Sequence, residues 1–427
     1  MVKRWSSLVF EIWRTEEDVV LFAKGVNSKQ GKNVDPADLA CVFGSGSGSG
    51  SVTTRVTHSA QEVFRCEHPA EEMREALDGA PVTLRWAGKL MDSVAYYGPN
   101  YHPILAKKHH EPPPSQMAVR IDKTNVSSIR DEEEMSGDGD SGMVCACTMV
   151  YNVAKFVKEW GVYHAHLGVD KFVFYDNNSE DELEEALGWL SGRDIGSARY
   201  PWPWPKTQEA GLSHCVVSTR SICKWMLFTD VDEFLYAPRF LPPTNGRESP
   251  LRQVIAGSRA LDPNVGQISM NCRDFGPSGL VSHPAGGVTQ GYTCRVKLEQ
   301  RHKSIVRLDA VGLDLHNVVH HFNLRPGFRT IRLSGSLAVV NHYKFQAWLE
   351  FRKKFHRRVS AYVVDWTEHK NMGSKDRTPG LGSKEVKPPN WETSFCEVVD
   401  TSLRNYTRQV FTTTSVSNGT PLLAWQL

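Results

Sequence analysis

Two aspartates separated by a single residue, Asp230 and Asp232, carry the strongest chemical signal in the sequence. They follow an apolar run over 224–229 that has the length and composition of a buried strand. Carboxylates at positions i and i+2 of an extended chain point to the same side, and their hard oxygen atoms suit Mg²⁺ or Mn²⁺, particularly where phosphate oxygens complete the shell. The pattern therefore predicts a metal-bridged diphosphate site.

Sequence context separates this pair from a second one with the same spacing. Asp138 and Asp140 lie in an acidic, glycine-rich stretch with no apolar run before them, so that pair is predicted to belong to a linker. For Asp230 and Asp232, an ordinary acidic turn in which an aspartate caps a helix stays open as the alternative interpretation.

A third metal ligand is predicted at His342, which ends a further apolar run that begins at Val339. An imidazole nitrogen can join two carboxylates on Mn²⁺. A histidine at a strand end is more often a hydrogen-bonded structural residue, so that alternative stays open when the residues are considered alone.

The elements that must position these side chains follow Gly142, where strand patterns and helix patterns alternate. Such alternation predicts an α/β fold with a mainly parallel sheet covered by helices on both faces, and ligands on such sheets bind at the carboxyl ends of the strands. A last amphipathic helix is expected over 346–366. Its basic cluster, which includes Lys354, is predicted to be a solvated face, with guidance of an anionic acceptor as the alternative. The expected strands are 143–150, 171–175, 197–200 and 224–229, and the expected helices are 156–167, 180–190 and 207–222.

The first part of the chain has a different pattern. Short β-rich runs, separated by turn residues, predict a small β-rich domain there. Prolines and then acidic and glycine-rich residues follow it, which is typical of a linker. The predicted divisions are a β-rich domain over 1–115, a linker over 116–142, the α/β domain over 143–405 and a C-terminal tail over 406–427.

The composition of the 427 residues is that of a globular protein, with 40% hydrophobic and 23% charged residues. Fifty Lys and Arg against 48 Asp and Glu leave a formal charge of +2, which argues against a nucleic-acid binder with a broad basic surface. No run approaches the roughly 20 apolar residues that a membrane-spanning helix needs. The nine cysteines form no zinc-type pattern, and their pairing stays open. Glycosylation sequons permit a secretory history and occur at Asn125, Asn177, Asn405 and Asn418.

An ordered series of short motifs runs from residue 149 to residue 343. The motifs are Met149-Val150-Tyr151-Asn152, Glu159-Trp160, His164, Gly168-Val169-Asp170-Lys171, 174–179, Gln208, His214-Cys215, Trp225, 230–234, 275–279, Lys303-Ser304-Ile305 and Asn341-His342-Tyr343. Together they resemble glycosyltransferase family 92, and most closely its plant branch, whose characterised members are galactan β-1,4-galactosyltransferases. One departure is Val153, where the family pattern favours Glu after Asn152.

The resemblance implies a fold and an activity. The fold would be a GT-A-type nucleotide-sugar transferase domain with Mn²⁺ (or Mg²⁺) as its cofactor. The activity would be an inverting transfer of galactose from UDP-galactose to a β-1,4-galactan, a pectin side chain of the cell wall. Residues 1–115 would bind carbohydrate.

The resemblance also implies a location and partners. The expected location is the Golgi, where a glycoprotein of this kind is held by a single-pass type II membrane anchor that this chain does not contain. The expected partners are a UDP-sugar donor and a polysaccharide or oligosaccharide acceptor, with no nucleic acid. A homodimer is an open expectation.

Residue roles for the metal follow from the resemblance, and the candidates for proton removal are carboxylates in the acceptor half of the fold or beside the metal pair. The predicted metal ligands are Asp230, Asp232 and His342. Asp274 is the predicted catalytic base, with Glu299 and Glu233 as alternative carboxylates and an ordinary turn residue as the alternative role for Asp274.

The donor-binding residues are predicted on the same basis. Asp176 and Asn178 could equally form a turn and a helix cap. Gln208 and His214 could instead anchor their helix to the sheet. The predicted donor-binding residues are Tyr151, Asn152, Asp176, Asn178, Gln208, His214 and Lys303.

Three other functions compete with this interpretation. One is a non-catalytic carbohydrate-binding protein with a degenerate transferase domain, which Val153 and the missing anchor would favour. Another is a transferase that uses a different UDP-sugar. The last is a metal-dependent phosphohydrolase, which would release sugar phosphate and UMP without needing an acceptor.

Overall fold

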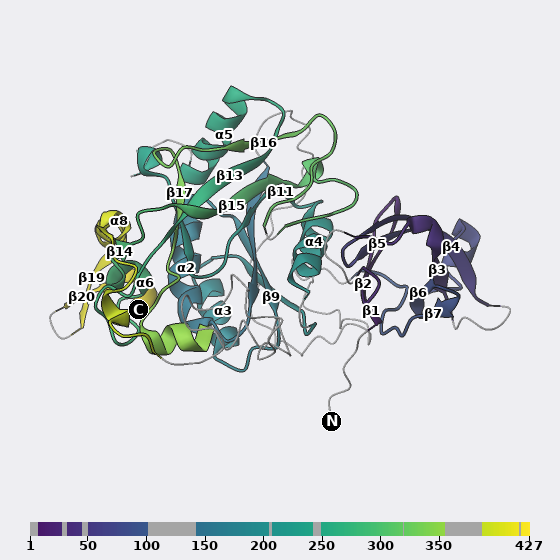
Figure 1. Ribbon diagram of the computed structural model, residues 1–427, viewed down its shortest axis with the longest axis horizontal. Helices are drawn as coiled ribbons and strands as arrows, with labels where there is room; N and C mark the ends of the chain where they lie inside the picture. The colour runs from purple at the N-terminus through teal and green to yellow at the C-terminus, as the bar shows by residue number, and fades with distance from the viewer. Residues whose placement is uncertain are drawn as a thin grey trace.

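The computed structural model has two β-sheets, a smaller one in the first hundred residues and a larger one that begins after residue 142 (Figure 1). The smaller sheet has seven strands in the order β1-β2-β5-β4-β3-β6-β7. All of its pairings are antiparallel. The structure describes residues 7–27, 32–44, 50–100, 142–204, 207–241, 249–318, 320–354, 387–417 and 420–427.

Strand β2 of the smaller sheet is buried on both sides. Val19 and Leu21 pack in the core of this sheet, whereas Val20 and Phe22 face the larger unit, because successive side chains of a strand point to opposite faces. Strand β2 therefore lies between two hydrophobic cores, one on each of its faces. The elements are β1 (Leu8–Arg14), β2 (Asp18–Lys24), β3 (Leu39–Phe43), β4 (Val52–Ala60), β5 (Val63–Glu67), α1 (Glu71–Arg74), β6 (Val82–Trp86) and β7 (Lys89–Leu90).

The larger sheet has nine strands, in the order β10-β9-β8-β11-β15-β13-β17-β12 with β16 beside β13. Strands β8 to β11 are parallel neighbours, so their carboxyl ends share one edge of the sheet. Five of its eight pairings are parallel. The predicted α/β fold, with a mainly parallel sheet preceded by a β-rich sheet, is confirmed. The strands are β8 (Met143–Val150), β9 (Lys171–Asp176), β10 (Ser197–Pro201), β11 (Cys223–Phe228), β12 (Glu233–Tyr236), β13 (Val265–Asp274), β15 (Gln300–Arg307), β16 (Arg329–Arg332) and β17 (Val339–His342).

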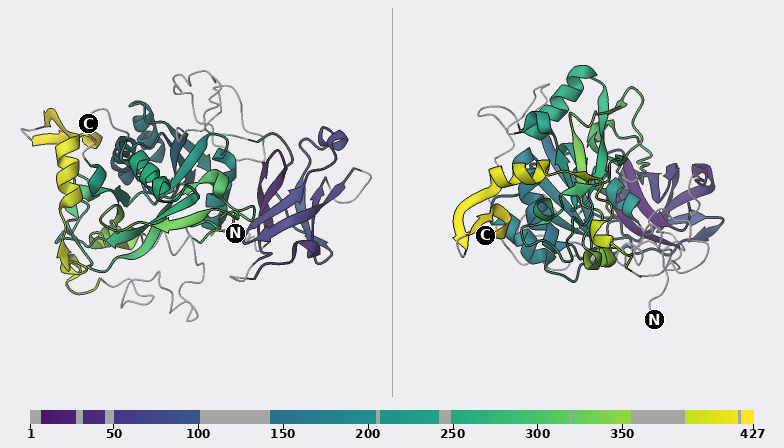
Figure 2. Two further views of the ribbon diagram at one scale, coloured as in Figure 1. Left: turned by 90° about the horizontal axis from the view of Figure 1, so that it is seen from above. Right: turned by 60° about the vertical axis from the view of Figure 1, so that its left-hand side comes forward.

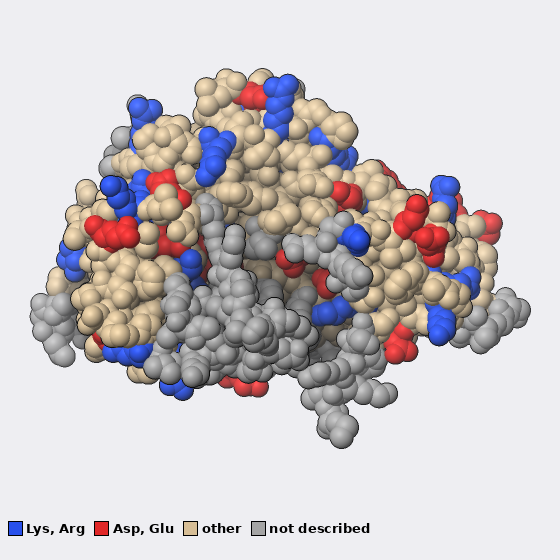
Figure 3. Space-filling view, in the orientation of Figure 1, with Lys and Arg blue, Asp and Glu red and all other residues tan. Residues whose placement is uncertain are grey.

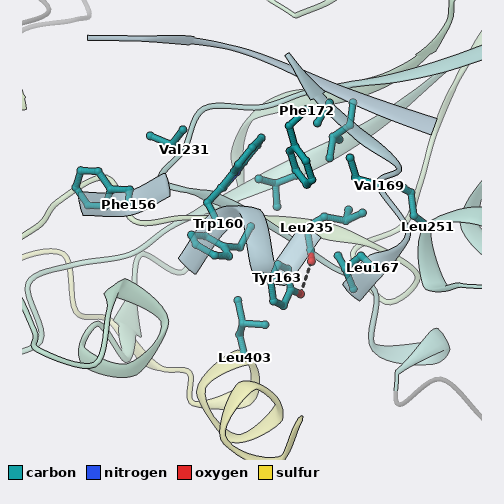
Figure 4. Packing of buried hydrophobic residues seen from close by; sticks show 14 of the residues in the cluster. Phe156, Trp160, Tyr163, Leu167, Val169, Phe172, Val231, Leu235, Leu251 and Leu403 are labelled. Atoms are coloured by element: carbon teal, nitrogen blue, oxygen red, sulfur yellow. Dashed lines mark hydrogen bonds between the residues drawn. The ribbon is translucent and has the colours of Figure 1, made fainter. Parts of the chain in front are cut away.

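Helices cover both faces of the larger sheet (Figure 1). Helix α2 packs on one face through Phe156, Trp160, Tyr163 and Leu167, which recur every three or four residues as an amphipathic helix requires (Figure 4). Helix α4 packs on the other face. The bounds are α2 (Ala154–Leu167), α3 (Leu183–Ser191), α4 (Gln208–Thr219), α5 (Pro250–Leu261), α6 (Val288–Gly291) and α8 (Ser402–Phe411).

The predicted last helix and the predicted tail differ from what the structure shows. Residues 348–354 are helical, and the rest of the helix expected over 346–366 lies outside the described residues. The boundary predicted between the α/β domain and the C-terminal tail, at residues 405 and 406, falls inside α8. The side chains of Tyr406 and Trp425 are buried in the main core, so these residues belong to the larger unit. Two short pairings complete this end, β14 (Cys294–Arg295) with β18 (Val398–Val399) and β19 (Thr412–Ser417) with β20 (Thr420–Leu423).

The smaller sheet docks beside α4 of the larger unit through aromatic side chains (Figures 1 and 2). The ring of Phe10 lies 5.7 Å from that of Trp202, edge to face. Trp13 and Phe22 each place a ring 5.2 Å from the imidazole of His214. Aromatic groups of this size dominate the energy of a buried interface, so the two sheets form one packed structure.

Eight of the nine cysteines are paired in disulfides, and Cys272 is buried and unpaired. The pairs are Cys41–Cys66, Cys145–Cys223, Cys147–Cys215 and Cys294–Cys396. Within the described ranges, no helix combines the length and apolarity that a bilayer-spanning segment requires. Basic and acidic side chains are interspersed on the face shown in Figure 3, in keeping with the small net charge.

Glu11 lies on β1, where β1 meets β10 of the larger sheet, and only 6% of its surface is exposed. Burial raises its pKa from 4.5 to about 8, against the opposing hydrogen bonds from the backbone of Ile12 and from Tyr200. The unfolded chain releases this proton near pH 4.5 and the folded protein near pH 8. The wild type must therefore lose stability as the pH rises between these values.

Glu11→Gln keeps a neutral group of the same shape at this position. We expect the variant to equal the wild type in stability near pH 4.5 and to exceed it at pH 8 by on the order of 2 to 4 kcal/mol. Denaturant unfolding at several pH values measures the difference, with the exposed Glu16→Gln as the matched control. A wild type that is the more stable protein at pH 8 would contradict the buried, protonated carboxyl.

Candidate functional site

Asp230 and Asp232 lie on the turn that connects β11 to β12. The backbone N–H of Glu233 donates to the carbonyl of Asp230 (3.0 Å), and the N–H of Asp230 donates to the Glu233 carboxylate (2.8 Å). Between the aspartates, Val231 is 5% exposed and packs in the core beside α2 (Figure 4). The extended chain expected at this position is wrong, because the side chain of Glu233 closes the segment into a turn.

Helix α2 holds the strand that follows this turn. Trp160 Nε1 donates to the carbonyl of Glu233 (3.0 Å), and Tyr163 Oη donates to the carbonyl of Leu235 (2.6 Å; Figure 4). His164 Nδ1 donates to Trp160, which leaves Nε2 to accept from the N–H of Leu235. Burial lowers the pKa of His164 to about 4, in keeping with this neutral form. Three side chains of α2 therefore fix the position of the turn that carries Asp230 and Asp232, the aspartate turn.

His342 and Lys354 lie beside Asp232. Strand β17 pairs with β12, with His342 opposite Glu233, and places His342 Nε2 3.9 Å from Asp232 Oδ2. The Lys354 ammonium forms an ion pair with Asp232 and lies 3.3 Å from His342 Nε2. Burial opposes ionisation of Asp232, but Lys354 and His342 outweigh it and hold its pKa below the ordinary value.

Asp274 lies behind His342, at the end of β13. His342 Nδ1 donates to one oxygen of Asp274 (2.9 Å), and Lys344 Nζ donates to the other (2.7 Å). Burial would raise the pKa of Asp274, but these two contacts outweigh it and hold the pKa well below its ordinary value. The Lys354 ammonium can only donate, so its 3.3 Å contact with Nε2 and the bond from Nδ1 fit the tautomer whose lone pair is on Nε2, on the side of Asp232. Both oxygens of Asp274 are thus engaged in orienting neighbouring groups, whereas the sequence suggested that this residue is a base.

Lys303 and His320 lie beside Asp230. Lys303, on β15, places its ammonium 3.0 Å from Asp230 and 2.9 Å from Glu233. Burial would lower the pKa of Lys303, but the two carboxylates raise it, so the side chain is a permanent cation. Partial burial opposes ionisation of Asp230, but Lys303 outweighs it and keeps the pKa of Asp230 below its ordinary value. Nε2 of His320 is 3.8 Å from Asp230 Oδ2.

Four of the predicted donor-binding residues lie at the carboxyl ends of β8 and β9, on the same edge of the sheet as the aspartate turn. Tyr151 and Asn152 follow β8, and Asp176 and Asn178 end and follow β9. Asp176 accepts from Arg199 Nε (2.9 Å) and from the N–H of Ser179 (2.9 Å). Asn152 Oδ1 accepts from the N–H of Glu180 (2.7 Å). Asn152 and Asn178 adopt the left-handed conformation, with φ of 52° and 59°.

The two remaining candidates lie on α4. Gln208 is its first residue, and His214 is fully buried. His214 Nδ1 is 2.7 Å from Tyr175 Oη, and its ring packs against Trp13 and Phe22 of the smaller sheet. These contacts match the anchoring role that was the alternative for His214.

The carboxylate oxygens and the imidazole nitrogen around the aspartate turn are of the chemical types that bind a divalent cation. Asp232 lies opposite His342 Nε2, and Asp230 lies on the same turn two residues earlier. Two carboxylates and one imidazole are a set of ligands that suits Mn²⁺. Lys303 and Lys354 place positive charge against these carboxylates. In the part of the chain that the structure describes, no three His, Cys, Asp or Glu side chains are drawn together closely enough to enclose an ion.

Two residues near the turn escaped the sequence analysis. Lys354 was predicted to belong to a solvated helix face, because a basic cluster alone gives no sign of a partner far away in the chain. His320 lies in a segment without periodicity, and the only signal was the pair His320-His321.

Comparison with known proteins identifies a family for this chain. A family model described as glycosyltransferase family 92 matches residues 141–374. A protein of Ricinus communis named for this family is 38% identical over 431 residues, which cover 99% of this chain and 71% of the relative. One of Arabidopsis thaliana, named in the same way, is 39% identical over 425 residues, which cover 100% of this chain and 69% of the relative.

Solved structures are less similar. A mannosyltransferase from Pyrobaculum calidifontis, solved with GDP-Man and Mn²⁺, aligns over 54% of this chain and 65% of its own, at 13% identity and a TM-score of 0.30. A glucosyl-3-phosphoglycerate synthase from Mycobacterium tuberculosis, solved with Mn²⁺ and UDP-glucose, aligns over 40% of this chain and 58% of its own, at 11% identity and a TM-score of 0.22.

Asp274→Asn tests the orienting role of this carboxylate. The amide cannot hold the protonated Nδ1 of His342 as firmly, so we expect Mn²⁺ affinity in the presence of UDP to fall roughly 10- to 100-fold, the usual cost of losing such a supporting group. Titration calorimetry measures the affinity. Glu299→Gln is the matched control, since Glu299 pairs with Arg273 and Asn271, and its affinity is expected to be unchanged. Wild-type Mn²⁺ affinity in Asp274→Asn, with sugar transfer lost, would instead favour the role of base.

Proposed function

The chain belongs to glycosyltransferase family 92, and we propose that it is a metal-dependent, inverting enzyme that transfers galactose from UDP-galactose to a β-1,4-galactan acceptor. Family membership supports glycosyl transfer. The observation that carries the metal-dependent mechanism is the pair of aspartates on one buried turn, faced by His342. Galactose and galactan are proposed from the motif resemblance to the plant branch.

Asp230, Asp232 and His342 are the residues that would hold the cation. A bound Mn²⁺ or Mg²⁺ supplies positive charge that stabilises the departing diphosphate. Asp274 fixes the ring of His342 so that Nε2 faces Asp232. Val231, between the two aspartates, packs in the core and so fixes the turn to it.

The lysines would act on the phosphate groups. Lys303 is buried between Asp230 and Glu233 and carries a fixed positive charge beside the proposed diphosphate position. The side chain of Lys354 is 22% exposed, against 9% for Lys303, so Lys354 is the freer of the two to leave Asp232 for a phosphate oxygen. Both groups would lower the electrostatic cost of bringing an anionic donor to an acidic turn.

The uridine end of the donor would lie over the carboxyl ends of β8 and β9. Such an edge is where nucleotides bind on parallel sheets. Tyr151 follows β8, and the hydrogen bonds that Asn152 forms with Ser179 and Glu180 connect the turn after β8 to the turn after β9. We propose that these turns shape the uridine pocket and that Arg199, through Asp176, fixes the second turn.

The location follows the same proposal. Four disulfides favour an oxidising compartment such as the lumen of the secretory pathway, where the Golgi enzymes of this kind act. The β-rich sheet is proposed to hold the polysaccharide acceptor, while its opposite face stays packed against α4.

A panel of UDP-sugars offered with β-1,4-galacto-oligosaccharides tests the proposed activity. We expect acceptor-dependent release of UDP with UDP-galactose, a product extended by a β-1,4 linkage, and loss of activity after chelation of divalent cations. Asp232→Asn is expected to reduce transfer at least about 100-fold, because the cation and the diphosphate lose a shared ligand.

Each competing function has a distinct outcome in this experiment. Preference for a different UDP-sugar would replace galactose in the proposal. Release of UMP without acceptor would indicate a phosphohydrolase. Binding of the oligosaccharide without turnover of any donor would indicate a non-catalytic carbohydrate-binding protein.

A further inference from the structure

His320 is buried near the aspartate turn without a hydrogen-bond partner. It is 3% exposed, and neither ring nitrogen has a partner among the described residues. Leaving a buried polar group unsatisfied costs on the order of 1 to 3 kcal/mol. Such a group in a folded protein needs an explanation, and a bound ion or an ordered water can supply one.

The surroundings of His320 repeat those of His342. Nε2 of His320 is 3.8 Å from Asp230 Oδ2, and Nε2 of His342 is 3.9 Å from Asp232 Oδ2. Each aspartate is also paired with one lysine ammonium. The turn is therefore flanked by two similar half-sites, each with one carboxylate, one imidazole and one lysine.

These nitrogen–oxygen separations are informative. They are too long for a hydrogen bond. Two ligand atoms that each lie about 2.1 Å from one ion are roughly 3 to 4 Å apart, depending on the angle between them. In both half-sites, the histidine and the aspartate are thus spaced like two ligands of a common cation.

The backbone holds His320 in this place. Its φ of 72° is in the left-handed region, which a non-glycine residue rarely adopts and which is often strained at functional sites. Ser304 donates a hydrogen bond to the carbonyl of His320. On the other side of the segment, Asn317 exchanges hydrogen bonds with Gln61 of the smaller sheet (2.7 and 3.2 Å). The backbone that carries the imidazole is therefore held by β15 and by the smaller sheet.

We propose that His320 is a further ligand of the divalent cation, through Nε2, and that the cation draws the two half-sites together when it binds. The protein ligands would then be Asp230, Asp232, His320 and His342. This inference rests on the proposed function and adds a second nitrogen ligand to it. Two imidazoles and two carboxylates suit Mn²⁺, Co²⁺ or Zn²⁺ better than Mg²⁺, which prefers oxygen ligands. The enzyme should accordingly discriminate against Mg²⁺.

Mn²⁺ binding to the purified full chain in the presence of UDP tests the inference without measuring sugar transfer. Titration calorimetry gives the affinities for Mn²⁺ and Mg²⁺, and pulsed electron paramagnetic resonance counts the nitrogen nuclei coupled to bound Mn²⁺. The variants are His320→Ala and His320→Gln. His321→Ala is the matched control, because His321 follows His320 in the chain but its ring pairs with His302 of β15. Asp232→Asn tests the metal site itself.

We expect two coupled nitrogens in the wild type and in His321→Ala, and one in both His320 variants. Mn²⁺ affinity should fall at least about tenfold in the His320 variants, since even supporting residues of metal sites cost this much. Mg²⁺ affinity should change less. The melting temperature without metal should be equal or higher, because an unsatisfied buried group has been removed.

The results that would overturn the inference are distinct from those that would overturn the proposed function. Unchanged Mn²⁺ affinity in both His320 variants, with binding lost in Asp232→Asn, would exclude His320 as a ligand and leave the metal site intact. If the His320 variants fail to fold, a single coupled nitrogen in the wild type would exclude it equally. No Mn²⁺ binding by the wild type would overturn this inference and the metal dependence together.

Discussion

The site depends on the balance of charge at the turn between β11 and β12. Asp230, Asp232 and Glu233 bring three carboxylates into a small, largely buried volume, and Lys303 and Lys354 place two positive charges against them. Buried charges without a partner are costly, so this turn persists only because cations are close at hand. A site that must attract positive charge in order to fold is also one that can bind a metal ion and the phosphate groups it carries.

The fold maintains this turn from every side. Helix α2 holds β12 through Trp160, Tyr163 and His164, while Val231 fixes the turn to the core. Strands β13 and β17 bring Asp274 against His342 in register. The smaller sheet reaches the same region through Gln61. The β-rich sheet is therefore more than an appendage, since it supports a segment that borders the site.

The sequence predicted what local patterns encode. Apolar runs located β8, β9, β10 and β11 to within two residues. Asp230 and His342 each follow or end such a run, which predicted that both lie at the same edge of the larger sheet. It did not reveal contacts between distant segments. His214 packs against the smaller sheet, and no periodic pattern in the sequence predicts how that sheet docks. Lys354 has the sequence surroundings of an ordinary solvated lysine. The position of His320 beside Asp230 depends on the left-handed backbone conformation of His320 itself. Disulfide pairing was out of reach for the same reason.

The central claim is that the aspartate turn is a cation site for a nucleotide diphosphate. Crystals grown with Mn²⁺ and UDP, measured at the manganese absorption edge, test it most directly. The account predicts one anomalous peak within about 2.5 Å of oxygens of both Asp230 and Asp232 and of His342 Nε2, with Lys354 displaced from Asp232. Bound UDP with no such peak, and both lysines still on their aspartates, would contradict it.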